Sequence, residues 1–259
     1  MKIGIVFSGG ASKGAYQLGF CKAVSEYVSA DEIVISASSI GVYNAMALVS
    51  GKLDVAEGLW RENDIKSLRD FYKVYIKTNF SYDSIDAVFK PIKNDFFVTI
   101  SKYPSMKPEY ANLKGKDEQT QKKILYAGLT VPKFMKAISI NGNKYVDGAY
   151  VDIIPTSPLP SDLQYLIVVH FDPQSDYEKL SNVKTIDIPF TEDNSFILKS
   201  FDTKKKSIEV MIEAGYTKSK KILETIFIEK KEIIHSKSLL NNGDYYAGQI
   251  NKVVKKILI

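Results

Sequence analysis

The fold is decided by the stretch IGIVFSGGASKG at residues 3–14, in which the strand-like run Ile3–Phe7 leads into a glycine-rich turn. A second stretch, IVISASSIG at residues 33–41, repeats this plan. A helical pattern follows each stretch, so each is a strand, a tight turn and a helix start. Two consecutive units of this kind predict an α/β fold with a mainly parallel central sheet flanked by helices. Active sites of such sheets form at the carboxyl ends of the strands, where both turns lie.

The two turns carry complementary chemistry. The first presents free backbone N–H groups at a helix N-terminus, where they can hold an anion, and consists of Gly9, Gly10, Ala11, Ser12, Lys13 and Gly14. The second lifts the Ser39 hydroxyl out of the sheet edge, and its small neighbours let the backbone bend; it consists of Ala37, Ser38, Ser39, Ile40 and Gly41. Gly41 marks Ser39, not Ser38, as the centre of the Ser-x-Gly pattern. A nucleophilic serine beside an anion-binding turn is typical of enzymes that catalyse acyl transfer.

A neutral serine needs a base to take its proton as it attacks. The chain has only two histidines, His170 and His235, and a carboxylate is the alternative base. Asp147 stands out because it follows a predicted Asn-Gly hairpin and precedes Gly148, where the chain can turn and let the carboxylate project. A conventional triad of Ser39, Asp147 and His170 is a second hypothesis, although His170 ends an apolar strand that fixes the direction of its side chain.

These residues carry a resemblance to a known family. In order and spacing, three blocks resemble the signature motifs of patatin-like phospholipases, namely Ser8–Tyr16, Ala37–Gly41 and Asp147-Gly148-Ala149. The resemblance covers about residues 2–62 and 119–172. It implies a patatin-like three-layer architecture and a Ser39–Asp147 dyad without histidine, in which Asp147 serves as general base toward Ser39 and then toward water. It also implies an oxyanion hole built from backbone N–H groups around Gly10, Ala11 and Ser12.

Two positions depart from the family pattern. Ala37 replaces the first glycine of the serine elbow, and Ala11 replaces the third glycine of the oxyanion loop. A backbone torsion open only to glycine at residue 11 would tilt an oxyanion N–H away. A nucleotide-phosphate loop is the competing interpretation of the glycine-rich turn, but Gly14 rather than serine or threonine follows Lys13. Lys13 itself is interpreted as a loop-anchoring or surface charge.

Size and composition bound the remaining possibilities. The chain has 259 residues, of which 45% are apolar and 25% charged, as in an ordinary soluble globular protein. We predict one domain over 1–259, with the motifs in about 2–172 and a helical part over about 190–259. The single cysteine, Cys21, is expected to be buried and cannot form an internal disulfide. Carboxylates and histidines lack metal-ligand spacing, so no metal or other cofactor is expected.

Charge and hydropathy indicate the partners. The net charge is +5, and Arg61 and Arg69 are the only arginines, which argues against nucleic acid. Lysines gather in the C-terminal third; they are read as solvated helix faces or, with an apolar stripe over Ile250–Leu258, as a peripheral contact with anionic membrane. The first residues fall short of a signal peptide, and no apolar window reaches about 18 residues. A cytoplasmic location is therefore expected.

Elsewhere the pattern predicts further elements with less chemistry. Strands are predicted over 2–7, 32–36, 96–101 and 163–171, and helices over 15–28, 41–50, 53–62, 83–92, 118–127 and much of the chain after 192. Asn141-Gly142 predicts a tight hairpin, and the pattern of the tyrosine- and lysine-rich segment 71–117 is less clear than elsewhere. Trp60 is interpreted as part of a core-packing helix face, and Asp152 and Asp172 as turn or cap residues.

The predicted function is a serine lipid acyl hydrolase of the phospholipase A or lysophospholipase type, acting on an acyl lipid through an acyl-enzyme. Two alternatives use the same segments of the chain. A non-lipid esterase or thioesterase would share the dyad and differ in its acyl pocket. A catalytically silent module that binds lipid or a partner is the other alternative, because Ala37 and Ala11 depart from the motifs.

Overall fold

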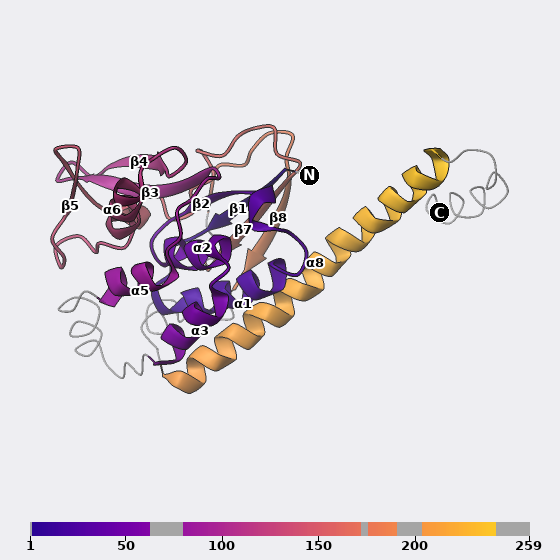
Figure 1. Ribbon diagram of the computed structural model, residues 1–259, viewed down its shortest axis with the longest axis horizontal. Coiled ribbons are helices and arrows are strands. Elements are labelled where there is room, and N and C mark those ends of the chain that lie inside the picture. The colour runs from indigo at the N-terminus through magenta and orange to yellow at the C-terminus, as the bar shows by residue number, and fades with distance from the viewer. Residues whose placement is uncertain (1, 63–79, 172–175, 191–203, 242–259) are drawn as a thin grey trace. The chain divides into compact units, whose positions relative to one another are not determined.

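The computed structural model describes residues 2–62, 80–171, 176–190 and 204–241 (Figure 1). It contains two compact units, residues 1–219 and residues 220–259. The first unit holds the sheet and both predicted turns, and the second begins inside helix α8 (Lys205–Asn241). The expectation of a single domain stays a prediction. Asp172 and the apolar stripe at Ile250–Leu258 lie outside the described residues.

The parallel part of the sheet confirms the α/β prediction. Its strands run in the order β3-β2-β1-β7-β8, with bounds β3 (Phe96–Tyr103), β2 (Ile33–Ala37), β1 (Ile3–Phe7), β7 (Tyr165–His170) and β8 (Lys184–Pro189). The central pair is in full register from Ile3↔Ile33 to Phe7↔Ala37, so β1 and β2 end side by side. Strand β7 lies between β1 and β8, which explains why its apolar run does not alternate with polar residues.

An antiparallel extension completes the sheet. It comprises β4 (Lys107–Asn112), β5 (Ile138–Ile140) and β6 (Asn143–Asp147). Strand β4 pairs with one edge of β3 over most of its length. The other edge is shared, since Ala37 of β2 pairs with Val98 and Asp147 of β6 pairs with Ile100. Strands β2 and β6 therefore approach each other from opposite directions, and their carboxyl ends meet.

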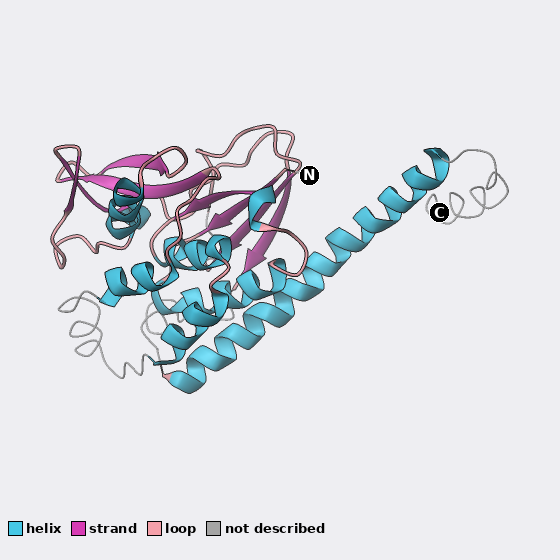
Figure 2. Cartoon of the chain, in the orientation of Figure 1, coloured by secondary structure: helices cyan, strands magenta, loops and turns pink. Residues whose placement is uncertain are grey.

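Helices cover the face of the sheet that carries Phe7 (Figure 2). They include α1 (Gly14–Val24), α2 (Ile40–Ser50), α3 (Leu53–Glu62), α5 (Phe80–Val88) and α6 (Glu118–Gly128). Phe7 stacks edge-on against Phe20 of α1, and the backbone of α8 lies so close to α1 that a side chain at Gly19 would strike the Ile212 carbonyl. Short 3-10 turns lie at η1 (Ala11–Lys13), η2 (Ala30–Glu32) and η4 (Gly148–Tyr150).

The opposite face is covered by connecting segments. Val6, Val34 and Val168 form a buried cluster with Ile154, Leu159, Leu163 and Leu166, against which Tyr177, Leu180 and Val183 also pack. The third layer over this cluster is thus built of the turns around residues 154–163 and 177–183. Burial of these aliphatic side chains contributes roughly 1.5–3 kcal/mol each, before the entropy of ordering them is subtracted.

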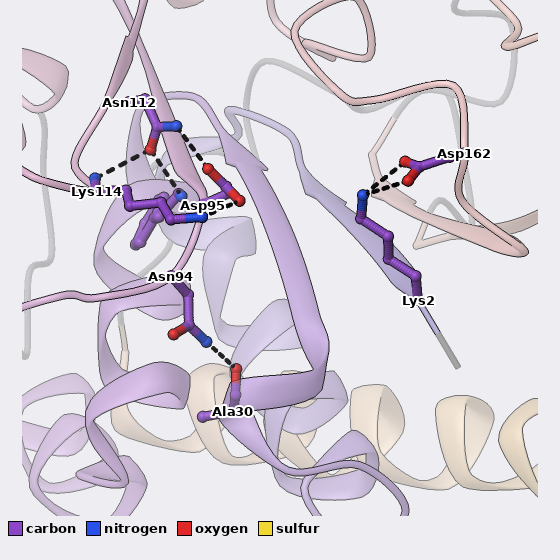
Figure 3. Close-up of polar contacts among 8 residues, drawn as sticks. Lys2, Ala30, Asn94, Asp95, Asn112, Lys114 and Asp162 are labelled. Carbon is purple, nitrogen blue, oxygen red and sulfur yellow. Dashed lines mark hydrogen bonds and ion pairs between the residues drawn. The ribbon is translucent and has the colours of Figure 1, made fainter.

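Polar contacts hold the amino-terminal edge of the strands (Figure 3). The Lys2 ammonium, just before β1, donates to both oxygens of Asp162, which precedes β7, at 2.6 and 2.7 Å. Before β3, the Asn94 amide donates to the Ala30 carbonyl, and Asp95 accepts from Asn112 and Lys114. These side chains are exposed or partly buried, and they lie at the end of the sheet away from the two motif-bearing turns.

Most predicted elements are confirmed, with shifted ends. The helix over 53–62, the Asn141-Gly142 hairpin and the helix end at Gly51 are observed, and Cys21 is buried. The helix predicted over 15–28 ends at Val24, and the one predicted over 83–92 runs from Phe80 to Val88. Strands β4 and β8 were not predicted. The side chains of β4 are exposed or partly buried, so its sequence carries no buried apolar face to signal a strand.

Membrane-spanning helices were searched among the described residues only. None of the helices there combines the length and the apolar composition that a bilayer crossing requires.

Candidate active site

Ser39 occupies a strained turn between β2 and α2. Its backbone has φ 53° and ψ −130°, in the left-handed half of torsion space that non-glycine residues rarely adopt. The turn is tight because β2 ends at Ala37 and α2 already begins at Ile40. Within it, the Ser38 N–H donates to the Phe7 carbonyl of β1 at 3.0 Å. Gly41 is required there, since a Cβ on it would lie 2.6 Å from the Phe7 oxygen. This geometry presents the Ser39 side chain at the end of α2.

The glycine-rich turn follows β1 and leads through η1 into α1. A Cβ on Gly10 would lie 2.1 Å from the Phe171 ring, and one on Gly14 would lie 2.6 Å from the Ile40 side chain. Ala11 has φ 49°, so the torsion at this departure from the family pattern is indeed left-handed. Among the described residues, no acceptor takes a hydrogen bond from the N–H of Gly10 or Ala11. Lys13 is buried rather than a surface charge.

Asp147 ends β6 and is only 3% exposed. Its carboxylate accepts the Ala149 N–H at 2.9 Å, and the Ser39 hydroxyl lies near enough to favour its ionised form. Burial raises the pKa of Asp147 to about 7, against the opposing effects of the Ala149 N–H and the Ser39 hydroxyl. Gly148 lets the chain turn here, because a Cβ on it would lie 2.6 Å from Thr99 of β3.

The three motif segments meet at Gly9. A Cβ on Gly9 would lie 3.2 Å from the Ser39 Cβ and 3.0 Å from the Ala149 Cβ. The Gly9 N–H donates to the Ile153 carbonyl at 3.1 Å, which ties the glycine loop to the segment after Asp147. Residues far apart in sequence therefore form one site, in which a hydroxyl, a carboxylate and unbonded backbone N–H groups are neighbours.

A buried polar network beneath the glycine loop was not predicted from the sequence. The Gln17 side-chain amide donates to the Ser8 carbonyl at 2.8 Å, and that of Asn44 donates to the Gly14 carbonyl at 2.8 Å and to Gln17. The Trp60 indole N–H donates to Asn44 at 3.2 Å, so Trp60 does more than pack. The signal that could have found this network is two amide residues, Gln17 and Asn44, inside largely apolar helices.

Two other predicted neighbours have structural contacts. The Ser38 hydroxyl is buried and donates to the Asp152 carbonyl at 3.0 Å. The Asp152 carboxylate accepts the Tyr110 hydroxyl at 2.7 Å. These bonds fix the segment after Asp147 to the serine elbow and to β4, which fits the turn role expected for Asp152.

His170 has its own acidic neighbour. It is buried at the end of β7, where its Nε2 lies 3.7 Å from an Asp187 carboxylate oxygen of β8 and its ring packs edge-on against Tyr177. The carboxylate of Asp147 instead accepts the Ala149 N–H and has the Ser39 hydroxyl as a neighbour. Within the described parts of the chain, no three histidine, cysteine or carboxylate side chains come together as a metal site would require.

Comparison with known proteins identifies a matching family and similar solved structures. The model of the family described as patatin-like phospholipase matches residues 5–160. The solved structure of VipD from Legionella pneumophila is similar, with 10% identity, a TM-score of 0.46, and coverage of 86% of this chain and 67% of that one. ExoU, in its complex with SpcU from the type III secretion system of Pseudomonas aeruginosa, gives 15% identity, a TM-score of 0.42, and coverage of 87% and 51%. No curated protein matches.

Proposed function

This chain belongs to the patatin-like phospholipase family, and from that premise we propose that it hydrolyses acyl lipids with a Ser39–Asp147 dyad. Family membership supports a lipid acyl hydrolase in general terms. The observation that carries the finer proposal is the Ser39 hydroxyl beside a buried Asp147 carboxylate, whose pKa is raised to about 7. A base with a pKa near the working pH combines a usable ionised fraction with a strong affinity for the proton.

In the first half of the proposed reaction, ionised Asp147 takes the Ser39 proton as Oγ bonds to the acyl carbon. The electron pair of the carbonyl moves to its oxygen, and the N–H groups of Gly10 and Ala11 receive the resulting negative charge. Collapse of this intermediate breaks the ester bond, and the leaving alcohol takes the proton held by Asp147. Each oxyanion donor of this kind is worth about 10²–10³ in rate.

In the second half, a water molecule attacks the acyl-enzyme, and Asp147 again accepts the proton. The tetrahedral intermediate collapses by returning that proton to Ser39 Oγ, which frees the carboxylic acid. The strained backbone at Ser39 supports both steps, because its side chain does not cap its own helix and interacts with Asp147. No metal takes part in this scheme. We propose phospholipase A or lysophospholipase activity, in the cytoplasm, as its biological form.

A fluorophosphonate probe tests the proposal, because it reacts with activated serines. We expect it to label wild-type protein at Ser39 and not the Ser39→Ala variant. Ser36→Ala is the matched control, since Ser36 lies on β2 just before the Ser39 turn and its buried hydroxyl has no partner in the described structure. Labelling that survives Ser39→Ala would identify another nucleophile.

A substrate panel then separates the enzyme classes. We expect release of fatty acid from phospholipid or lysophospholipid, unaffected by EDTA. Labelling of Ser39 with turnover only of water-soluble esters or thioesters would favour a non-lipid esterase, and an unlabelled, folded protein would favour a silent binding module.

A further inference from the structure

Exposed apolar side chains gather directly after Asp147. Tyr150, Val151 and Ile153 are 63%, 41% and 40% exposed, so three large apolar side chains face solvent within four consecutive residues. We call this group the 150–153 lip. A cluster of this kind beside a candidate site marks a surface that meets another apolar body.

The lip lies at the site itself. The Ile153 side chain would be 3.2 Å from a Cβ on Gly9, which in turn would be 3.2 Å from the Ser39 Cβ. The lip also follows the Asp-Gly-Ala motif without a break, so its position is set by the same segment that carries Asp147. A surface bound by the lip would therefore lie next to the reacting groups.

The backbone of the lip is bonded inward. The N–H groups of Val151 and Asp152 donate to the Gly148 carbonyl at 2.9 and 3.0 Å. The Asp152 carbonyl accepts the Ser38 hydroxyl, and the Ile153 carbonyl accepts the Gly9 N–H. A polar backbone group that enters hydrocarbon without a partner is strongly destabilising, and these four groups already have partners. The lip can thus present its apolar side chains to hydrocarbon without exposing those groups.

A second segment beside Asp147 adds positive charge. The Asp147 N–H donates to the Thr130 carbonyl at 2.9 Å, and the chain after Thr130 carries exposed Phe134 between exposed Lys133 and Lys136. An aromatic ring flanked by lysines suits the interface of an anionic membrane, where basic residues near the surface are attracted to the lipid headgroups.

We propose that the 150–153 lip is the docking surface by which this protein enters an anionic lipid surface, with Lys133 and Lys136 binding headgroups. The proposal rests on the proposed function for its choice of a lipid partner. It places membrane contact at the site rather than at the C-terminal lysines and apolar stripe considered from the sequence.

Vesicle binding tests the lip with a double variant, Tyr150→Ser with Val151→Ser. The control is Val55→Ser with Val210→Ser, which removes two comparably exposed apolar side chains on α3 and α8. With vesicles of phosphatidylcholine and phosphatidylglycerol, we expect the lip variant to sediment at least about tenfold more weakly than wild type. The control should bind like wild type, and both variants should turn over a soluble short-chain ester within about twofold of it.

A cysteine-scanning measurement gives an independent readout. Cys21 is buried and its thiol pKa is raised by burial, so a cysteine introduced at the surface is the one that reacts with a fluorophore. An environment-sensitive dye on Val151→Cys should brighten and shift to the blue with anionic vesicles, and the same dye on Val210→Cys should not.

The outcomes are distinguishable from failure of the proposed function. Equal vesicle binding by the lip variant and its control, or equal dye responses at the two positions, would overturn the proposal even if lipid hydrolysis is confirmed. If the wild-type protein forms a dimer that the lip variant cannot form, and vesicle binding is unchanged, the proposal is overturned. The lip would then be assigned to contact with a second copy of the chain. Absence of hydrolysis with lip-dependent vesicle binding would refute the enzyme and retain the docking surface.

Discussion

The two ends of the parallel strands are built on different principles. At the amino-terminal edge, ordinary polar side chains such as Lys2, Asp95 and Asp162 make solvent-accessible hydrogen bonds and ion pairs (Figure 3). At the carboxyl edge, Ala11 and Ser39 hold left-handed torsions and Asp147 is buried with a raised pKa. The amino-terminal edge of the strands therefore carries solvent-accessible polar contacts. The carboxyl edge carries strained backbone torsions and a desolvated carboxyl group.

This difference shows that the energetically costly features of the candidate site are confined to the carboxyl edge of the strands. Left-handed torsions of non-glycine residues and buried carboxyl groups each cost stability, and they persist only where surrounding structure enforces them. Here the enforcing contacts are the close approach of Gly41 to Phe7 and of Gly148 to Thr99. Substitutions at the carboxyl edge should therefore separate activity from stability, and those at the amino-terminal edge should affect neither strongly.

Among variants that keep Ser39, the largest expected effect is that of Asp147→Asn. The amide keeps the shape of the side chain but cannot accept the Ser39 proton, so turnover of a short-chain ester should fall by about 10³-fold or more. A variant that keeps above about a tenth of the wild-type rate would show that another group is the base.

The same variant changes the pH dependence of stability. Between about pH 4 and the native pKa of about 7, the unfolded chain loses the Asp147 proton while the folded chain keeps it, so wild-type stability declines as pH rises and then levels off. Asp147→Asn lacks this decline. Melting temperatures across this range should therefore favour the variant increasingly toward neutral pH, and parallel curves for the two proteins would contradict the raised pKa.

Asn44→Ala is expected to have the next largest effect. It leaves the Trp60 indole N–H and the Gly14 carbonyl buried without their partner, which costs about 1–3 kcal/mol of unfolding free energy. Turnover per folded molecule should also fall, because the glycine loop loses a support. Ser50→Ala, on the same helix, removes only a hydroxyl bonded to the Met46 carbonyl and serves as the control in denaturant titrations.

Ala11→Gly and Ser39→Gly form a matched pair that separates strain from function. Glycine adopts the left-handed torsion without a Cβ penalty, so each should be more stable than alanine at the same position by about 0.5–1 kcal/mol. Ala11→Gly should retain or raise activity, whereas Ser39→Gly should be inactive. If Ala11→Gly destabilised the protein, the torsion at residue 11 would not be strained.

The smallest effect is expected at the amino-terminal edge. Lys2→Met removes the ion pair with Asp162, in which both side chains are largely exposed, so solvent and salt already screen it. Melting temperature and turnover should match those of wild type. A loss of activity in this variant would contradict the separation of the two edges.

Local features of this chain were predictable from its sequence, and long-range placement was not. Both turns were predicted because a strand, a bend and a helix start are encoded within about a dozen consecutive residues. The meeting of Ser39 and Asp147 depends on β3, whose Val98 and Ile100 pair with β2 and β6 in one register. Each of these pairings joins segments that are far apart in the sequence, and no local pattern specifies it.

Features without a local pattern were also missed. Gln17 and Asn44 lie in helices whose other residues are largely apolar, and their hydrogen bonds exist only once α1 and α2 pack. Tyr150 is exposed because no other segment of the described structure covers it, whereas a run of apolar residues in the sequence predicts burial. The amide network beneath the glycine loop and the exposed 150–153 lip therefore become visible only in the folded structure.

A histidine-free protein tests the central claim most directly. The chain has two histidines, so His170→Gln with His235→Gln removes every imidazole while leaving Ser39 and Asp147 in place. The rate of fluorophosphonate labelling at Ser39 is measured against pH, with the melting temperature as the folding control. A dyad predicts that labelling still rises with pH through about 7 at a rate near that of wild type. A folded variant that labels orders of magnitude more slowly would contradict it and make histidine the base.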